Sequence, residues 1–312
     1  MARRAILPAL EELIPPVVPY ALQIYAREEP PKLLFKMDSG ETAIIHSSTG
    51  VRQGCNLGPL CYSAGLLRLL TDFNANPPVA GAQIMAYRDD LLVLLPPTHA
   101  TSASAVEAVT TWIQGHMTPL GVELNRQKSS VLFPPGTDTG TWKEEDRTIL
   151  QRTQLKVAPA GVRIVGVPVG DPNYVRRAVC KISRGEPAAL LRELTTLEDA
   201  QASFQILRLS AATRLHSLLR AIPPTLTKMA ALEFDSLLEW ALMAIIRGQH
   251  LKEGDGEQAR DKASSPTTAP PPSALTQEAI RQARLPVREG GLGLPSAAEV
   301  SGQAFIGCQA LV

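Results

Sequence analysis

Aromatic residues, net charge and long apolar runs are all scarce in this sequence of 312 residues. Phe, Trp and Tyr together make up 4% of the chain, which argues against a platform that stacks the bases of single-stranded nucleic acid. The net charge at pH 7 is +1, so the composition makes no general electrostatic case for a polyanionic partner, and such a partner must be recognised at local sites. No apolar run approaches the roughly 20 residues of a membrane span, which predicts no membrane partner.

Cysteine is scarce as well, and nothing at the N-terminus is typical of a secretory signal. The four cysteines lack the spacing of a metal site or a disulfide framework, which favours buried free thiols in a reducing compartment. The first apolar stretch is interrupted by Pro8 and Pro15 before it reaches the length of a signal peptide. We therefore expect an intracellular protein of the cytoplasm, the nucleus or both. The cysteines are Cys55, Cys61, Cys180 and Cys308.

The pattern of predicted secondary structure changes near residue 170. Up to that point, amphipathic helical patterns are mixed with short apolar β-runs that are bounded by turn residues. The helices are expected at Ala2–Leu13, Val18–Arg27, Pro59–Phe73 and Thr101–Leu120, the strands at Lys32–Met37, Glu41–His46, Ala82–Tyr87, Leu91–Leu95 and Ser129–Phe133, and a hairpin at Val162–Val169.

Beyond residue 170 the pattern is helical, and it is interrupted once by a segment rich in charge, Ser and Pro. Helices are predicted at Tyr174–Arg184, Ala188–Leu197, Ala200–Ala221 and Leu226–Gly248. The interrupting segment has the composition of a disordered linker. We accordingly predict four regions, namely a mixed domain at 1–170, a helical domain at 171–252, a linker at 253–274 and a small helical tail at 275–312.

Two adjacent carboxylates, Asp89 and Asp90, stand between two of the apolar β-runs. Like charges at such short range repel, and a divalent cation relieves that repulsion because carboxylate oxygens are the ligands Mg²⁺ prefers. The pair alone is more typical of a solvated turn. Its apolar flanks favour a functional interpretation, because they indicate that the acidic turn emerges from a core.

A glycine-rich loop precedes this hairpin in the chain. Residues 50–60 are Gly-Val-Arg-Gln-Gly-Cys-Asn-Leu-Gly-Pro-Leu. Glycine lets backbone approach a nucleotide closely, Gln53 offers both a donor and an acceptor, and Pro59 is suited to open a helix whose N-terminus favours a phosphate. In isolation the same residues are typical of a turn that leads into a helix.

The loop and the hairpin, in this order, resemble the reverse transcriptases of non-LTR (LINE-type) retrotransposons. Residues 87–90, Tyr-Arg-Asp-Asp, are similar to the YxDD box of that family. The loop is similar to its G-x-x-Q-G-x-x-x-[SG]-P signature, with Asn56 where Pro is usual. The resemblance implies that Asp89 ligates Mg²⁺ or Mn²⁺ with help from Asp90, that Tyr87 braces the hairpin at the primer end, and that nucleotide and template are contacted by Arg52, Gln53 and Gly54.

Two weaker motifs extend the resemblance. Residues 121–129 are similar to the G-h-x-h-N-x-x-K-[ST] segment, which implies a catalytic role for Lys128 at the pyrophosphate leaving group. Residues 165–170 are similar to the hairpin that grips the primer strand, here Gly166, Val167 and Pro168.

The fold that follows is α+β, a polymerase palm of antiparallel sheet and helices followed by an all-helical thumb. Its activity would be RNA-directed DNA polymerisation by a two-metal mechanism, with RNA template, DNA primer and dNTP as partners. The family's first metal-binding Asp and its fingers have no counterpart in these residues, since they precede the helix that residues 2–7 resemble. Asp38 is better interpreted as a turn residue than as a substitute. We therefore expect a truncated domain that is inactive as written.

Two other function classes compete with the enzyme. A non-catalytic nucleic-acid-binding protein derived from a reverse transcriptase would use cationic helix faces, and salt-dependent binding without turnover would distinguish it. A helical interaction protein would leave the loop and the hairpin unexplained. The candidate phosphate contacts of the second class are Arg176, Arg177, Lys181, Arg184, Arg208, Arg214 and Arg220.

Overall fold

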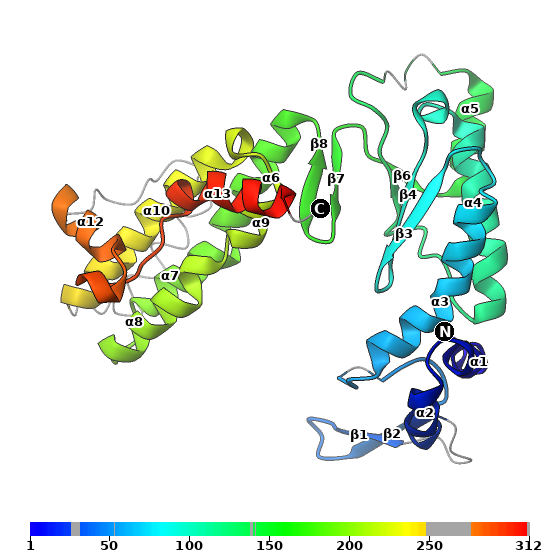
Figure 1. The fold of residues 1–312 in the computed structure, drawn as a ribbon, viewed down its shortest axis with the longest axis horizontal. Coiled ribbons are helices and arrows are strands. Elements are labelled where there is room, and N and C mark those ends of the chain that lie inside the picture. Colours follow the sequence, from blue (N-terminus) through cyan, green and yellow to red (C-terminus); the bar gives the residue numbers. More distant parts are fainter. Residues whose placement is uncertain (26–31, 53, 138–139, 141, 248–275, 311–312) are drawn as a thin grey trace. The chain divides into compact units, whose positions relative to one another are not determined.

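The computed structural model describes residues 1–25, 32–52, 54–137, 140, 142–247 and 276–310 (Figure 1). The chain divides into two compact units, Met1–Pro159 and Ala160–Val312. Helices and short, mostly antiparallel strand pairs make up a mixed fold. Among the helices of the described ranges, none is both long and apolar enough to cross a membrane. The predicted linker at 253–274 lies outside these residues.

The first unit combines five helices and three strand pairs within its described residues. The helices are α1 (Arg3–Leu13), α2 (Val18–Tyr25), α3 (Gly58–Ala75), α4 (Ala103–Met117) and α5 (Glu144–Thr153). The strands are β1 (Lys32–Lys36), β2 (Thr42–His46), β3 (Gln83–Tyr87), β4 (Asp90–Leu94), β5 (Ser130–Val131) and β6 (Lys156–Val157). Pairs β1–β2 and β3–β4 are antiparallel, whereas β5–β6 is parallel.

Local chemistry explains where the central helices begin. Pro59 lies in the first turn of α3, where its missing N–H is not needed. The hydroxyl of Ser102 accepts a hydrogen bond from the Ala105 N–H and so caps α4. The predicted hairpins at 32–46 and 82–95 are confirmed, and Asp38 lies in the turn between β1 and β2.

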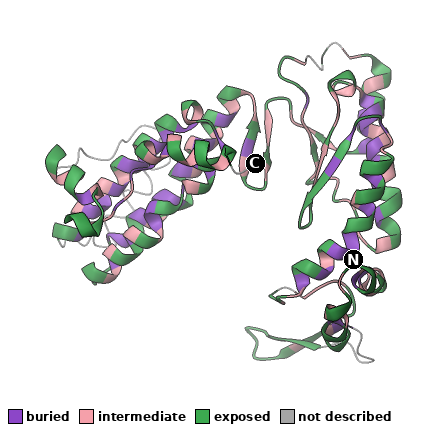
Figure 2. Ribbon diagram, viewed as in Figure 1, coloured by how far each residue is buried: buried purple, intermediate pink, exposed green. Residues whose placement is uncertain are grey.

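Burial in the first unit is concentrated where α3, α4 and hairpin β3–β4 meet (Figure 2). Phe73 of α3, Ile84 of β3 and Ile113 of α4 belong to one buried cluster. The register pairs Ile84 with Val93, so this face of the hairpin packs against the helices. The opposite face is exposed, and Tyr87 on it retains 57% of its accessible surface.

The second unit consists of one strand pair followed by helices in the residues that are described. The strands are β7 (Gly161–Ile164) and β8 (Val167–Gly170), which pair antiparallel. The helices are α6 (Pro172–Arg184), α7 (Glu186–Leu194), α8 (Ala200–Leu209), α9 (His216–Ala221), α10 (Pro224–Arg247), α12 (Gln277–Arg284) and α13 (Ala297–Gln309). The sequence-based division placed β7–β8 with the first region, whereas the structure groups it with the helices.

One buried carboxylate ties the C-terminal segment to the long helix α10. Asp235 is 5% exposed and accepts hydrogen bonds from the Ser296 hydroxyl at 2.6 Å and from the backbone N–H of Ala297 at 2.7 Å. It therefore caps α13 from another helix. Upstream of that cap, a side chain at Gly291 would lie 2.0 Å from the Leu285 carbonyl oxygen, so the glycine-rich turn packs backbone against backbone.

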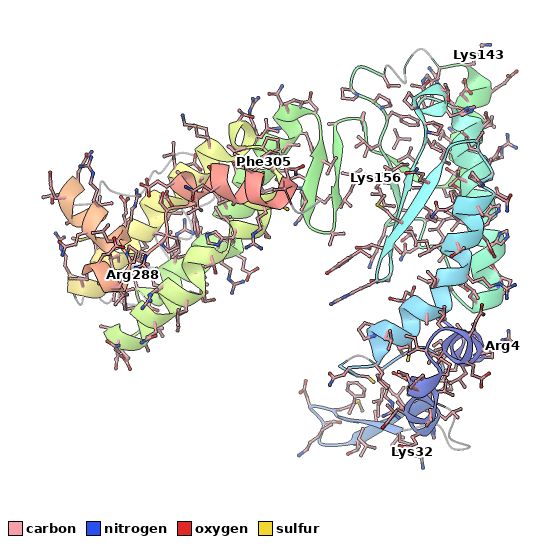
Figure 3. All side chains as sticks on the ribbon, viewed as in Figure 1. Arg4, Lys32, Lys143, Lys156, Arg288 and Phe305 are labelled. Carbon is pink, nitrogen blue, oxygen red and sulfur yellow. The ribbon has the colours of Figure 1, made fainter. Side chains whose placement is uncertain are left out.

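Two parts of the sequence-based fold differ from the structure. The single helix predicted at Ala200–Ala221 is wrong, because it is broken between α8 and α9. The Thr213 hydroxyl donates to the Ser210 carbonyl at 3.0 Å, and such side-chain bonds compete with a continuous helix. Helix α5 and strand β6 were not predicted. Lys156, labelled in Figure 3, begins β6 and pairs with Ser130.

Candidate active site

Hairpin β3–β4 presents its two carboxylates at a two-residue turn. Arg88 and Asp89 form the turn, and Asp90 pairs with Tyr87 at the ends of the two strands. Arg88 has a φ of 58°, in the left-handed region. Its guanidinium carbon lies 5.8 Å from the centre of the Tyr87 ring, and within the described part of the chain it forms no ion pair with Asp89 or Asp90. Both carboxylates are exposed, and among the described residues neither is paired with a cation.

Helix α3 is joined to this hairpin by hydrogen bonds. Near its C-terminus, the side-chain amide of Asn74 bonds to both the N–H and the C=O of Ile84. Nearer its N-terminus, burial and then the negative charge of Asp89 raise the pKa of the Tyr62 hydroxyl above its ordinary value. The negative charge of Asp89 thus disfavours ionisation of the Tyr62 hydroxyl.

The loop itself is held by two arginines and a buried tyrosine. Arg3 of α1 donates to the Gly50 carbonyl at 3.2 Å and to the Ser47 hydroxyl at 3.0 Å. Its guanidinium carbon lies 5.4 Å from the centre of the ring of Tyr25, a side chain that is 3% exposed. The guanidinium of Arg52 donates to the Ile24 carbonyl at 3.4 Å. These contacts join residues 22 or more positions apart, and local sequence patterns gave no signal of them.

The conformation of the loop explains why it contains glycine. Gly54 has a φ of 81°, which a residue with a side chain adopts only at a cost. Gly58 has no such φ, but a side chain there would lie 3.1 Å from the Arg52 carbonyl. Gln53 lies outside the described residues.

Cys55 lies in the loop within a set of hydrogen-bond donors. The hydroxyl of Tyr25 and the backbone N–H groups of Leu57 and Gly58 stabilise its thiolate, so its pKa is lowered from the ordinary value of a thiol. Burial and the hydrogen bond to Cys55 raise the pKa of Tyr25 to about 12. Burial raises the pKa of Cys61, which is fully buried nearby in α3.

The sequence of this chain is similar to known proteins over both the loop and the hairpin. Residues 18–169 match the family model described as reverse transcriptase (RNA-dependent DNA polymerase). The 132 kDa protein of the retrotransposable element SLACS, from Trypanosoma brucei gambiense, is 29% identical over 257 residues. The chain carries a reverse transcriptase domain of the retrotransposon type. The resemblance that the loop and the hairpin indicated is therefore confirmed.

The SLACS relative is much longer than this chain. The aligned part covers 82% of the chain and 18% of the relative. Because the alignment is longer than the family match, it extends beyond residues 18–169 of the reverse transcriptase domain.

Lys128 of the reverse transcriptase domain lies in an exposed turn that Asn125 organises. The Asn125 side chain accepts a hydrogen bond from the Lys128 N–H at 3.1 Å, and the Ser129 hydroxyl donates to the Asn125 carbonyl at 2.8 Å. These bonds account for the Asn and Ser of the motif. In the described residues the Lys128 side chain has no hydrogen-bond or ion-pair partner.

The predicted primer-grip residues Gly166, Val167 and Pro168 lie in the second unit. Gly166 follows Val165 in the two-residue turn between β7 and β8, and both have positive φ, 48° at Val165 and 86° at Gly166. Val167 is half-buried and Pro168 is buried.

The carboxylate oxygens at the hairpin are of the ligand type that a divalent cation such as Mg²⁺ prefers. In the part of the chain that the structure describes, no group of three or more His, Cys, Asp or Glu side chains is placed to hold a metal ion. The hairpin supplies two carboxylates, Asp89 and Asp90. Mg²⁺ in nucleotide-processing enzymes is commonly held by one or two carboxylates together with substrate phosphates and water.

Proposed function

We propose that this reverse transcriptase domain is the palm and thumb part of an RNA-directed DNA polymerase, with hairpin β3–β4, α3 and α4 as its palm and the helices from α6 to α10 as its thumb. The observation that carries the proposal is the pair of exposed carboxylates, Asp89 and Asp90, at the β3–β4 turn, within the residues that match the reverse transcriptase family model. Asn74 joins this hairpin to α3, the helix that the glycine-rich loop leads into. An incoming dNTP needs a cation for its phosphates and a loop whose backbone can come close to it.

Asp89 and Asp90 are the proposed ligands of Mg²⁺ or Mn²⁺. These two carboxylates would hold the ions, which would supply activation of the primer hydroxyl and neutralisation of the charge on the pyrophosphate. Tyr87 lies across the strand pair from Asp90 and carries Arg88 on its ring, so it braces the turn on the side where the primer end would lie. The stacking of Arg88 keeps its positive charge on the ring and away from an ion pair with the ligands.

The loop residues are proposed to shape the site for nucleotide and template. Gly54 allows a close approach of backbone, and Gln53 reads or orients the base pair. Arg52 is a positioning residue, because its guanidinium bonds to the end of α2 and holds the loop there. Lys128 is proposed to contact the leaving pyrophosphate, and the turn at Gly166 to contact the DNA primer that is paired with the RNA template.

Direct metal binding tests the proposed ligands. Mn²⁺ bound by the full chain is measured by electron paramagnetic resonance in the wild type and in Asp89→Asn. The matched control is Asp38→Asn, which changes an exposed hairpin-turn aspartate at another site. We expect Asp89→Asn to weaken Mn²⁺ binding by about tenfold and the control to leave it unchanged. Equal binding by all three proteins would show that the hairpin is not the metal site.

Primer extension on an RNA template tests the activity itself. The sequence-based expectation is that these 312 residues do not extend a primer, since the family's first metal-binding Asp and its fingers have no counterpart in them. Incorporation of dNTP that requires Mg²⁺ or Mn²⁺ and is abolished by Asp89→Asn would overturn that expectation and establish polymerase activity. Incorporation that Asp89→Asn leaves unchanged would contradict the role of the hairpin.

A further inference from the structure

The second unit contains a cavity of about 700 Å³ to which the proposed function assigns no ligand. It lies along one face of α6 and is bordered by strand β7, by the turn between α6 and α7 and by Arg214. All of its lining residues belong to the second unit. The charged and aromatic residues of the lining are Arg163, Tyr174, Arg177, Lys181, Glu186 and Arg214.

Positive charge dominates this cavity. Four of these residues are cationic and one, Glu186, is anionic. Glu186 is already paired with Arg214 at 2.7 Å. Arg163 donates one hydrogen bond, at 3.2 Å to the Gly166 carbonyl, and in the described ranges neither it nor Arg177 nor Lys181 forms an ion pair. The cavity therefore has a surplus of positive charge with donors that remain available.

Two arginines of this unit that lie outside the cavity have acidic partners. Arg184 makes two hydrogen bonds to Glu233, at 2.9 and 2.7 Å. Arg284 is paired with Glu239 at 2.9 Å and with Glu299 at 2.6 Å. By contrast, Arg177 and Lys181 lie one helical turn apart on α6, where like charges destabilise a helix. A bound anion would remove that repulsion.

We infer that this cavity binds the phosphate of a single nucleotide unit, either an unpaired nucleotide of a strand or a phosphorylated strand end. Arginine forks and a lysine are suited to phosphate oxygens. The ring of Tyr174 supplies an aromatic wall for a base. Gly161 lies so close to this ring that an added side-chain carbon would be 2.2 Å from it, which holds the ring in place.

The size of the cavity selects against a duplex. A volume of about 700 Å³ is in the range of small-ligand pockets. The major groove of a DNA duplex alone is about 12 Å wide, so paired strands can contact only the rim of such a cavity, whereas one unpaired nucleotide can enter it. The inference is independent of the proposed polymerase function, because it requires neither a metal ion nor the hairpin of the first unit.

Fluorescence anisotropy with a short single-stranded DNA carrying a 5′-phosphate tests the inference on the full chain. EDTA is present throughout, so binding at Asp89 and Asp90 does not contribute. We expect Arg177→Glu to weaken binding by about tenfold or more and to lower the salt dependence by about one counterion. The matched control is Arg176→Glu, which makes the same change one residue away and outside the cavity, and we expect less than about a twofold loss.

Further variants and competitors identify the source of the phosphate and keep the test valid if one variant misfolds. Arg177→Gln and Lys181→Glu, checked by thermal melting, give the same prediction if Arg177→Glu fails to fold. Weaker binding of blunt duplex than of single strand supports the inference. Equal losses in Arg176→Glu and Arg177→Glu would overturn it, because a general charged face would then explain the binding. Displacement by inorganic tripolyphosphate as readily as by the oligonucleotide would assign the cavity to free oligophosphates and overturn the nucleotide assignment.

Discussion

The side-chain amide of Asn74 binds both polar groups of the Ile84 backbone, with Nδ2 donating to the carbonyl at 3.0 Å and Oδ1 accepting from the N–H at 2.9 Å. This pair of bonds joins the C-terminal end of α3 to strand β3. It therefore helps to fix the position of the hairpin that carries Asp89.

Replacing Asn74 with Asp removes the donor and places a carboxylate against the Ile84 carbonyl. We expect the free energy of unfolding of the first unit to fall by about 1–3 kcal/mol. Urea unfolding followed by tryptophan fluorescence measures the change. Asn76→Asp, at an exposed position two residues later, is the control, and we expect its effect to stay within about 0.5 kcal/mol. Equal effects of both changes would show that the bonds to Ile84 contribute nothing particular.

The cap that Asp235 provides for α13 predicts a larger loss in the second unit. Asp235→Ala leaves the Ala297 N–H and the Ser296 hydroxyl without their acceptor inside the protein. We expect the stability of this unit to decrease by about 2 kcal/mol or more. Glu233→Gln on the same helix breaks an exposed pair with Arg184, and we expect a loss below about 1 kcal/mol. Thermal melts that rank the two variants in the opposite order would contradict the cap.

Substitution by glycine is expected to stabilise the protein at Val165 and to destabilise it at Val169. Val165 is 49% exposed and has a φ of 48°, which a β-branched residue adopts with strain. Val165→Gly relieves that strain, and we expect a gain of about 1 kcal/mol. Val169→Gly, at a similarly exposed position in strand β8, is expected to destabilise, since glycine weakens a strand. Melting temperatures of the two variants decide whether the signs differ.

The thiol of Cys55 should react at lower pH than an ordinary cysteine. Its pKa is lowered by the Tyr25 hydroxyl and by backbone N–H groups, and the thiolate is the reactive form. We expect iodoacetamide to modify Cys55 before the buried Cys61, whose pKa is raised. Tyr25→Phe removes the donor, so the pH midpoint of Cys55 alkylation should rise.

Mass spectrometry of peptides alkylated across a pH series measures that midpoint. Tyr20→Phe removes a hydroxyl from an exposed tyrosine on the same helix and is the control. An unchanged midpoint in Tyr25→Phe, or an equal rise in Tyr20→Phe, would contradict the role assigned to the Tyr25 hydroxyl.

The sequence predicted those elements whose burial pattern is local. Strands β3 and β4 alternate along two short runs around an acidic turn, and the pattern marked both of them. Helix α5 escaped notice because only Leu150 and Thr153 on it are buried, which leaves no apolar stripe to detect. The break at Ser210 was hidden for the opposite reason, since Leu207, Ala211 and Leu215 keep a helical spacing across it.

The candidate site divides in the same way. Asp89 and the glycine-rich loop stand out in the sequence because their chemistry is unusual for their position. Arg3, Tyr25 and Asn74 do not, because each acts through a contact with a distant or backbone group that no local pattern specifies. The cationic cavity was half anticipated, since Arg177 and Lys181 were expected to share a face, whereas the part played by Arg163 depends on the tertiary fold.

The positions of the core residues in the sequence decide which unit can complete its hydrophobic core first during translation. Every core of the first unit is built from residues within 1–159, so those cores can close as soon as that stretch has left the exit tunnel. The core of the second unit contains Leu294 and Ala297 next to residues from α6 and α10. The core of the second unit therefore cannot be completed until translation has passed these two residues. During that interval the apolar faces of its earlier helices are exposed, and we expect chaperones to bind the nascent chain there.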